Sequence, residues 1–172
     1  MKATEVLADG FGRIREVVHE VVEGLSADEL AARPDPGANS IAWLVWHLTR
    51  VQDDHVADAA RREQVWHAQG WAERFALPFP AAATGYGHTA QQVGKVRVES
   101  GELLLGYLDA VHDQTLAFVR GLAAADLERV VDEGWDPPVT LGVRLVSVLS
   151  DDLQHAGQAA YVRGALHRRR GA

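Results

Sequence analysis

The chain has 172 residues, 47% of them hydrophobic, which suffices for a single domain (residues 1–172) with a buried core. It contains no cysteine, which excludes disulfides, thiolate zinc sites and cysteine nucleophiles. The net charge of −7 argues against a nucleic-acid partner. Neither a signal peptide nor the roughly 20 apolar residues of a membrane span is recognisable, so we expect a cytoplasmic protein with no membrane contact.

Four segments carry apolar residues at the spacing of an amphipathic helix, and none alternates as a strand does. The first helix is expected over about 4–24. Asn39 is a good N-cap for the second, Ser100 is a plausible cap for the third, and the fourth is expected from Thr140 to about Arg163. This pattern predicts an all-α protein, a four-helix bundle.

A long segment, about 60–99, separates the second helix from the third and has little apolar periodicity. Only "TAQQV", capped by Thr89, is predicted to form a short helical turn. Loops of this length are uncommon inside a domain and are often functional. We expect this one to cross an end of the bundle as a long crossover connection, and we expect about 166–172 to form a solvated basic tail.

Two of the eight histidines are expected to point into the bundle. His47 lies three residues after Leu44, and His155 lies seven after Val148, so both fall on the apolar spacing of their helices. Asp151 lies one turn before His155 on the same face. Two imidazoles and a carboxylate suit zinc, nickel, iron or manganese, and three protein ligands leave positions open for water or substrate.

Two alternatives remain open at this point. Asp152 lies three residues before His155 and competes with Asp151 as the carboxylate ligand, and the spacing does not choose between them. A buried histidine hydrogen-bonded to an acid one turn away is also a common feature of protein cores. The same pattern is therefore compatible with a purely structural role.

The chain resembles the DinB/YfiT-like superfamily in four segments: "NSIAWLVWHLTRVQDDHVAD" (39–58), "WAERFALPF" (71–79), "TGYGHT" (84–89) and "TLGVRLVSVLSDDLQHAGQAAYVRG" (140–164). The similarity is to the branch related to mycothiol-dependent maleylpyruvate isomerase. It implies a four-helix bundle with a long crossover connection and a metal site on the second and last helices. His47 and His155 match the first and last ligands. Asp151 stands where relatives have histidine or glutamate, which favours it over Asp152.

This resemblance implies a metal-dependent enzyme of thiol-transferase or isomerase type, with a low-molecular-weight thiol such as mycothiol as cosubstrate. One divalent ion would lower the pKa of the thiol. Zinc or nickel is the first expectation for this ion, and iron or manganese is the second. A metal-dependent hydrolase of a small substrate is the alternative, and a non-catalytic, small-molecule-binding or dimeric module of the same fold is another. Family members commonly pair, and the tryptophan-rich second helix offers apolar surface, so we expect a homodimer.

Further residues near the expected site are candidates for supporting roles. Tyr86 and His88 in the long loop are candidates for a general acid or base. Arg50, three residues after the first ligand, could meet an anionic substrate or pair with an acid one turn on. Gln158, three residues after the last ligand, could orient that ligand or touch substrate, and Gly157 could admit a neighbouring helix or a ligand close to the backbone.

Overall fold

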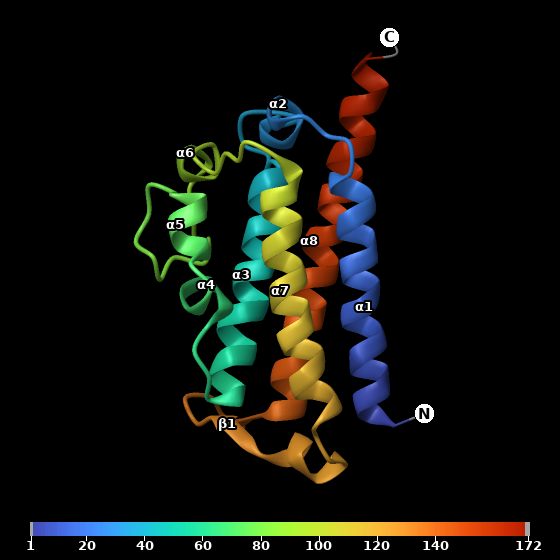
Figure 1. The fold of residues 1–172 in the computed structure, drawn as a ribbon. Coiled ribbons are helices and arrows are strands. Elements are labelled where there is room, and N and C mark those ends of the chain that lie inside the picture. Colours follow the sequence, from blue (N-terminus) through green and yellow to red (C-terminus); the bar gives the residue numbers. More distant parts are fainter. Residues whose placement is uncertain (1, 171–172) are drawn as a thin grey trace.

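Four long helices run side by side in the computed structural model, which describes residues 2–170 (Figure 1). They are α1 (Ala3–Val22), α3 (Ile41–Ala60), α7 (Gly101–Arg120) and α8 (Leu141–Arg170). The predicted all-α bundle is therefore confirmed, with each long helix beginning within two residues of its expected start. The second helix is capped by Ser40, whose hydroxyl accepts a hydrogen bond from the backbone N–H of Trp43, and not by the expected Asn39.

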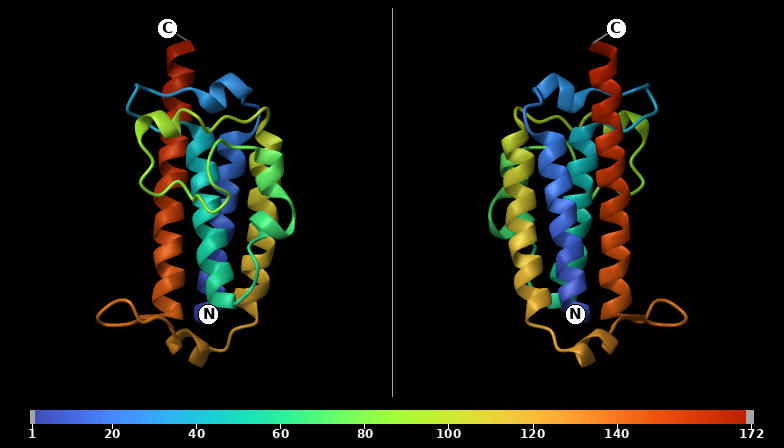
Figure 2. Two further views of the ribbon diagram at one scale, coloured as in Figure 1. Left: turned by 90° about the vertical axis from the view of Figure 1, so that its left-hand side faces the viewer. Right: turned by 90° about the vertical axis from the view of Figure 1, so that its right-hand side faces the viewer.

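The order of the helices around the bundle decides which residues can meet. Helices α1 and α8 point the same way, and α3 and α7 run in the opposite direction (Figure 1). Helix α3 packs against α7 and α8, as α1 does, so α1 and α3 lie diagonally across the bundle (Figure 2). The short helix α2 (Ala27–Ala31) lies in the connection between them. Helices α3 and α8 are thus antiparallel neighbours.

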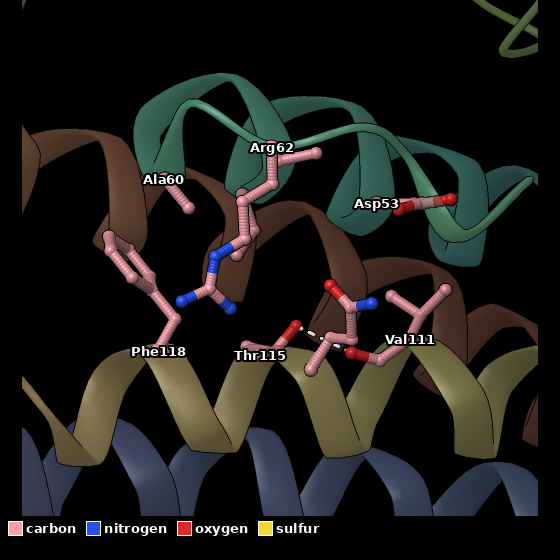
Figure 3. Close-up of a pocket in the computed structure, with 9 residues that line it drawn as sticks. Asp53, Ala60, Arg62, Val111, Thr115 and Phe118 are labelled. Atoms are coloured by element: carbon pink, nitrogen blue, oxygen red, sulfur yellow. Dashed lines mark hydrogen bonds between the residues drawn. The ribbon is translucent and has the colours of Figure 1, made fainter. Parts of the chain in front are cut away.

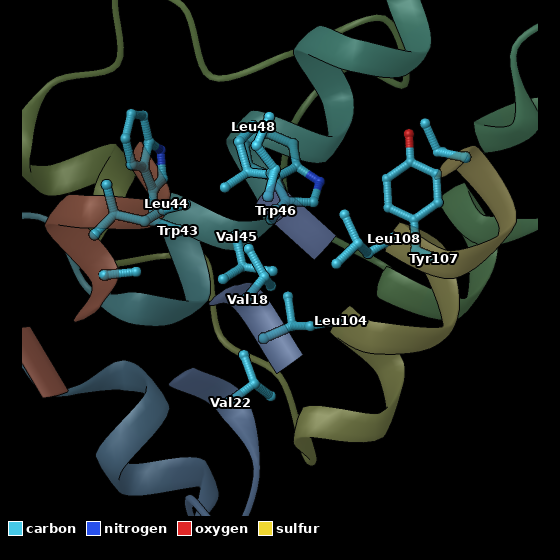
Figure 4. Close-up of a cluster of buried hydrophobic side chains, with 14 of the residues drawn as sticks. Val18, Val22, Trp43, Leu44, Val45, Trp46, Leu48, Leu104, Tyr107 and Leu108 are labelled. Carbon is cyan, nitrogen blue, oxygen red and sulfur yellow. The ribbon is translucent and has the colours of Figure 1, made fainter. Parts of the chain in front are cut away.

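The core surrounds α3 on almost every side. All residues from 41 to 50 are buried, including Trp43 and Trp46 with 6% and 1% of their surface exposed. Trp46 belongs to the buried hydrophobic cluster (Figure 4), and its ring packs against Trp66, Phe79 and His88 of the connection between α3 and α7. The expectation that these tryptophans offer surface for a dimer is therefore wrong, because they are used inside the chain. The homodimer itself stays a prediction.

The connection between α3 and α7 contains three short helices: α4 (Val65–Ala68), α5 (Trp71–Phe75) and α6 (Ala90–Val93). Only α6 was predicted, and its Thr89 hydroxyl accepts a hydrogen bond from the backbone N–H of Gln92 as a cap should. The segment does not merely cross an end of the bundle, as expected. Because α3 and α7 are parallel, it returns along the whole outer side of α3 (Figures 1 and 2).

A buried polar cluster attaches this connection to the bundle. The Asp53 carboxylate accepts hydrogen bonds from the backbone N–H groups of Val65 and Trp66 at 2.9 and 2.8 Å. It also accepts one from the Tyr107 hydroxyl at 2.8 Å, and the Arg50 guanidinium lies 3.8 Å from it. A buried carboxylate is tolerated only with such partners. The cluster therefore fixes the start of α4 against both α3 and α7.

Between α7 and α8 the chain forms a 3₁₀ turn (Ala124–Glu128) and a small antiparallel hairpin. Its strands, β1 (Val130–Asp132) and β2 (Val139–Thr140), were not predicted, because two or three residues are too few to show alternation. The hairpin lies beside the end of the bundle where α8 begins (Figure 1).

Helix α8 extends beyond its expected end near Arg163. The Arg163 guanidinium donates hydrogen bonds to the carbonyl groups of Glu20 and Glu23, where α1 ends and its carbonyls lack helical partners. The expected basic tail over about 166–172 is helical as far as Arg170, and residues 171 and 172 lie outside the described part of the chain. Among the described helices, none combines the length and apolar character needed to cross a membrane.

We predict that Gly12→Ala stabilises the protein by about 0.5–1 kcal/mol, because alanine loses less backbone freedom than glycine in a helix interior. No atom lies within 4 Å of the position that the new Cβ would take. The measurement is thermal unfolding followed by circular dichroism. Gly10→Ala is the matched control, since its Cβ would lie 3.0 Å from Leu149 Cδ2 and should lose part of the gain. Equal effects of the two changes would contradict this packing.

Candidate metal centre

Three of the predicted site residues converge in the groove between α3 and α8. His47 projects from α3, and Asp151 and His155 project from consecutive turns of α8. One donor atom from each residue lies within 4.8 Å of the other two, and His155 Nε2 lies 3.6 Å from Asp151 Oδ1. Ligands bound about 2 Å from one ion are separated by a similar distance. The antiparallel packing of α3 and α8 thus brings together residues more than a hundred positions apart.

Both imidazoles are held by oxygen atoms at Nδ1. The Nδ1 of His47 is 2.6 Å from the carbonyl oxygen of Thr84, and the Nδ1 of His155 is 3.0 Å from the side-chain oxygen of Gln158. A carbonyl oxygen only accepts hydrogen bonds, so each Nδ1 is the donor in its contact and Nε2 is the ring nitrogen left for a metal. This second layer of contacts is the arrangement that orients histidine ligands toward a metal.

An indole ring forms one wall of the group. Trp43 stacks on the His47 ring with 4.5 Å between centroids, and its edge faces His155 at 6.0 Å. Burial lowers the pKa of His47, and the nearby His155 adds to this effect, although the Thr84 hydrogen bond opposes it. His47 is therefore neutral at neutral pH, which is the form that binds a metal.

The donor set fits a divalent cation. Asp151 Oδ2 is buried without a hydrogen-bond partner, which is unusual for a carboxylate oxygen and is the condition that a bound cation would relieve. Two imidazole nitrogens and one carboxylate suit zinc, nickel, iron or manganese. His47, Asp151 and His155 are therefore the residues that would hold one ion.

Asp152 is excluded as the third donor by its position. Its side chain is completely buried in the bundle and does not belong to the converging group. Neither of its oxygens has a hydrogen-bond partner. Burial, with the adjacent Asp151 charge as a smaller cause, raises the pKa of the Asp152 carboxyl well above its usual value. The two neighbouring aspartates thus have different environments, and the structure places Asp151 with the histidines.

A cleft of about 490 Å³ opens beside the donor group, within the size range of small-molecule sites. Ten residues line it: His47, Val51, Asp54, His55, Thr84, Tyr86, Trp135, Ser147, Val148 and Asp151. A second cavity, between α3 and α7, has a volume of only about 10 Å³ and admits no more than a water molecule (Figure 3). Another cleft, of about 600 Å³, is lined by residues that include Gly157, Gln158 and Tyr161 but by none of the three donors. The cleft that His47 and Asp151 line is therefore the candidate ligand site.

The other candidates from the sequence are divided between the cleft and the interior. Tyr86 lines the cleft with 92% of its surface exposed, and Gln158 contacts a donor histidine. Arg50 is fully buried and donates a hydrogen bond to the Tyr107 hydroxyl on α7. It does not reach the cleft, where a contact with substrate was expected. His88 accepts a hydrogen bond from the Trp43 indole and lies outside the cleft lining, and its acid–base role stays a prediction.

The structure adds residues that the sequence did not indicate. Thr84 acts through its backbone carbonyl, which has no side-chain signature, and Trp135 reaches the cleft from the β1–β2 hairpin, which was itself not predicted. Gly157 is not needed for close packing, because no described atom lies within 4 Å of a Cβ built there. The expectation of a closely packed helix at Gly157 is therefore wrong within the described chain, and the alternative of a ligand close to its backbone stays a prediction.

Comparison with known proteins identifies a family and a near structural relative. The sequence model of the DinB superfamily matches residues 11–159. The crystal structure of a conserved protein from Enterococcus faecalis superposes with a TM-score of 0.89 at 34% sequence identity, covering 95% of this chain and 96% of that one. No curated protein matches the sequence.

We predict that Gly85→Ala weakens metal binding by about tenfold or more, as loss of a contact that orients a histidine ligand does. Gly85 has φ +96°, and a Cβ there would lie 2.7 Å from His47 Nδ1. Gly87→Ala is the matched control, because Gly87 also has a positive φ of +72° but has open space around it. Isothermal titration with zinc should find metal affinity near wild type for G87A. Equal losses in both variants would contradict the proposed role of the Gly85 contact.

We predict opposite effects for two neighbouring substitutions, Asp151→Leu and Asp152→Leu. Asp151→Leu removes a donor and should abolish stoichiometric metal binding, measured by elemental analysis after incubation and desalting. Asp152→Leu should keep the metal and stabilise the fold by about 1–3 kcal/mol at pH 8, because it removes an unpaired buried carboxyl.

The stabilisation by Asp152→Leu should also depend on pH. The folded chain holds the Asp152 proton more tightly than the unfolded chain, so wild-type stability falls as pH rises above about 4. The variant lacks this contribution, and its advantage in chemical denaturation should therefore be larger at pH 8 than at pH 4. An advantage that does not grow with pH would contradict the assignment.

Proposed function

Because the chain belongs to the DinB superfamily, we propose that it is a metal-dependent enzyme of thiol-transferase or isomerase type, using a low-molecular-weight thiol such as mycothiol. The observation that carries the proposal is the convergence of His47, Asp151 and His155 beside an open cleft, with both histidine Nδ1 atoms already in contact with other oxygens. Zinc or nickel is the proposed ion.

When bound, the ion would supply positive charge that lowers the pKa of a coordinated thiol, and the same charge would act on a water in a hydrolase. The chain itself contains no cysteine, so the sulfur nucleophile would come from a cosubstrate. Thr84 and Gln158 hold the two imidazoles in their metal-binding tautomer. Trp43 covers one side of the donor group and limits the approach of water from that side.

The cleft provides the space that such a reaction needs. Its volume of about 490 Å³ accepts a small thiol together with part of a second substrate. Tyr86 lies at this cleft with an exposed hydroxyl, and we propose it as the group that exchanges a proton with the substrate. A homodimer and a cytoplasmic location remain predictions of the sequence.

The test begins with metal content. Purified protein is incubated separately with zinc, nickel and manganese, desalted and analysed for bound metal. We expect about one ion per chain in the wild type and little in His47→Ala and His155→Ala. His67→Ala is the matched control, since His67 is exposed on α4 and lies outside the cleft lining. Absence of all three metals from the wild type would refute the metal-dependent function.

The second part of the test separates thiol chemistry from hydrolysis. Small thiols should raise the melting temperature of the metal-loaded protein and leave that of the metal-free protein unchanged, because binding only to the loaded form stabilises it. Metal binding without any thiol effect would contradict the thiol-dependent proposal. It would favour a hydrolase or a non-catalytic binding module of the same fold.

A further inference from the structure

We infer that the cleft beside the donor group selects neutral or cationic ligands that carry a flat apolar group, and that it rejects ligands rich in carboxylate or phosphate. The inference deepens the proposed function by assigning a substrate class to the same cleft. It is stated for the chain without its ion, because a divalent ion at Asp151 would add positive charge, and it is carried by the charge and shape of the cleft walls.

The charge of the lining is the first observation. Among the ten residues that line the cleft, none is an arginine or lysine, and two, Asp54 and Asp151, are acidic. His55 also lines it, but burial lowers the pKa of His55, with the charge of Arg144 as the next cause, so it adds no positive charge at neutral pH. An anionic ligand would therefore meet two carboxylates and no side-chain cation.

The nearby arginines, Arg50 and Arg144, form their contacts outside the cleft. Arg144 is paired with Asp132 on the hairpin at 2.8 Å. Arg50 is fully buried, and donates hydrogen bonds to Gln64 and to the Tyr107 hydroxyl. Neither guanidinium belongs to the cleft lining, so neither is placed to receive a carboxylate or phosphate there.

The two aromatic side chains of the cleft are the second observation. Tyr86 and Trp135 have 92% and 68% of their surface exposed, and they come from two separate loops that both line the cleft. Exposed aromatic side chains in a concave site offer ring faces for stacking on a flat apolar group. With Val51 and Val148 on the helical walls, they make the cleft suitable for such a group.

The loops that carry the two aromatic residues have contacts of their own. Asp132, at the start of the Trp135 loop, pairs with Arg144 on α8 at 2.8 Å and accepts a hydrogen bond from the backbone N–H of Gly134. The backbone N–H of Tyr86 lies 3.4 Å from the Thr84 hydroxyl. A loop that is ordered before binding loses less conformational freedom when a ligand binds.

The test uses three probes of nearly equal size and different charge: benzylamine, benzyl alcohol and benzoate. They are titrated by ligand-detected NMR into the full chain after treatment with a chelator, so that no bound ion can attract the anion. We expect benzylamine and benzyl alcohol to bind about tenfold or more tightly than benzoate, and benzylamine the most tightly.

Variants locate the binding in the cleft. Tyr86→Ala and Trp135→Ala should each weaken benzyl alcohol binding by about fivefold or more, as loss of an aromatic contact does. Tyr161→Ala is the matched control, because Tyr161 is 69% exposed on α8 but outside the cleft lining, and its loss should change nothing. Binding of benzoate as tight as that of benzylamine, or full binding by Tyr86→Ala and Trp135→Ala, would overturn the inference. Selective binding in a chain that takes up no metal would uphold the inference while refuting the proposed enzyme.

Discussion

The parallel direction of α3 and α7 is the constraint on which the rest of the molecule depends. Parallel neighbours cannot be joined by a short turn, so residues 61–100 must travel back along the bundle, and they do so over the outer face of α3. This covering layer buries α3 on its outer side as well as its core side. It also delivers the Thr84 carbonyl to His47. The site thus depends on the connection as much as on the helices.

Three aspartates in this bundle have different surroundings and therefore different roles. Asp53 is surrounded by two backbone N–H donors and a tyrosine hydroxyl, and it serves as a fixed attachment for the connection. Asp151 has one buried oxygen without a partner, at the edge of a cleft that a cation can enter. Asp152 is buried without partners or access, and burial raises the pKa of its carboxyl well above the usual value. The role of each aspartate is therefore set by its access to hydrogen-bond donors and solvent, because the residue type is the same in all three cases.

Periodic spacing was sufficient for the long helices and for the two inward histidines, whereas the choice of Asp151 over Asp152 came from the family resemblance. A four-residue separation places Asp151 and His155 on one face, and His47 follows the apolar stripe of its own helix. The sequence could not reveal features that depend on which segment covers a helix or on the position of a backbone group. Arg50 shares a face with His47, and only the returning connection turns it into an interior residue. Thr84 acts through a carbonyl that every residue possesses.

The hairpin that carries Trp135 and the loop that carries Tyr86 differ in their relation to the donor group. The segment around Tyr86 also orients a donor through Thr84, so a change of length or sequence there would disturb the donor group. The β1–β2 hairpin contributes no donor and lies at the periphery of the bundle. Over evolutionary time it can therefore lengthen, shorten or exchange its aromatic residue without loss of the fold. A change in the hairpin would thus alter one side of the cleft and leave the donor group intact.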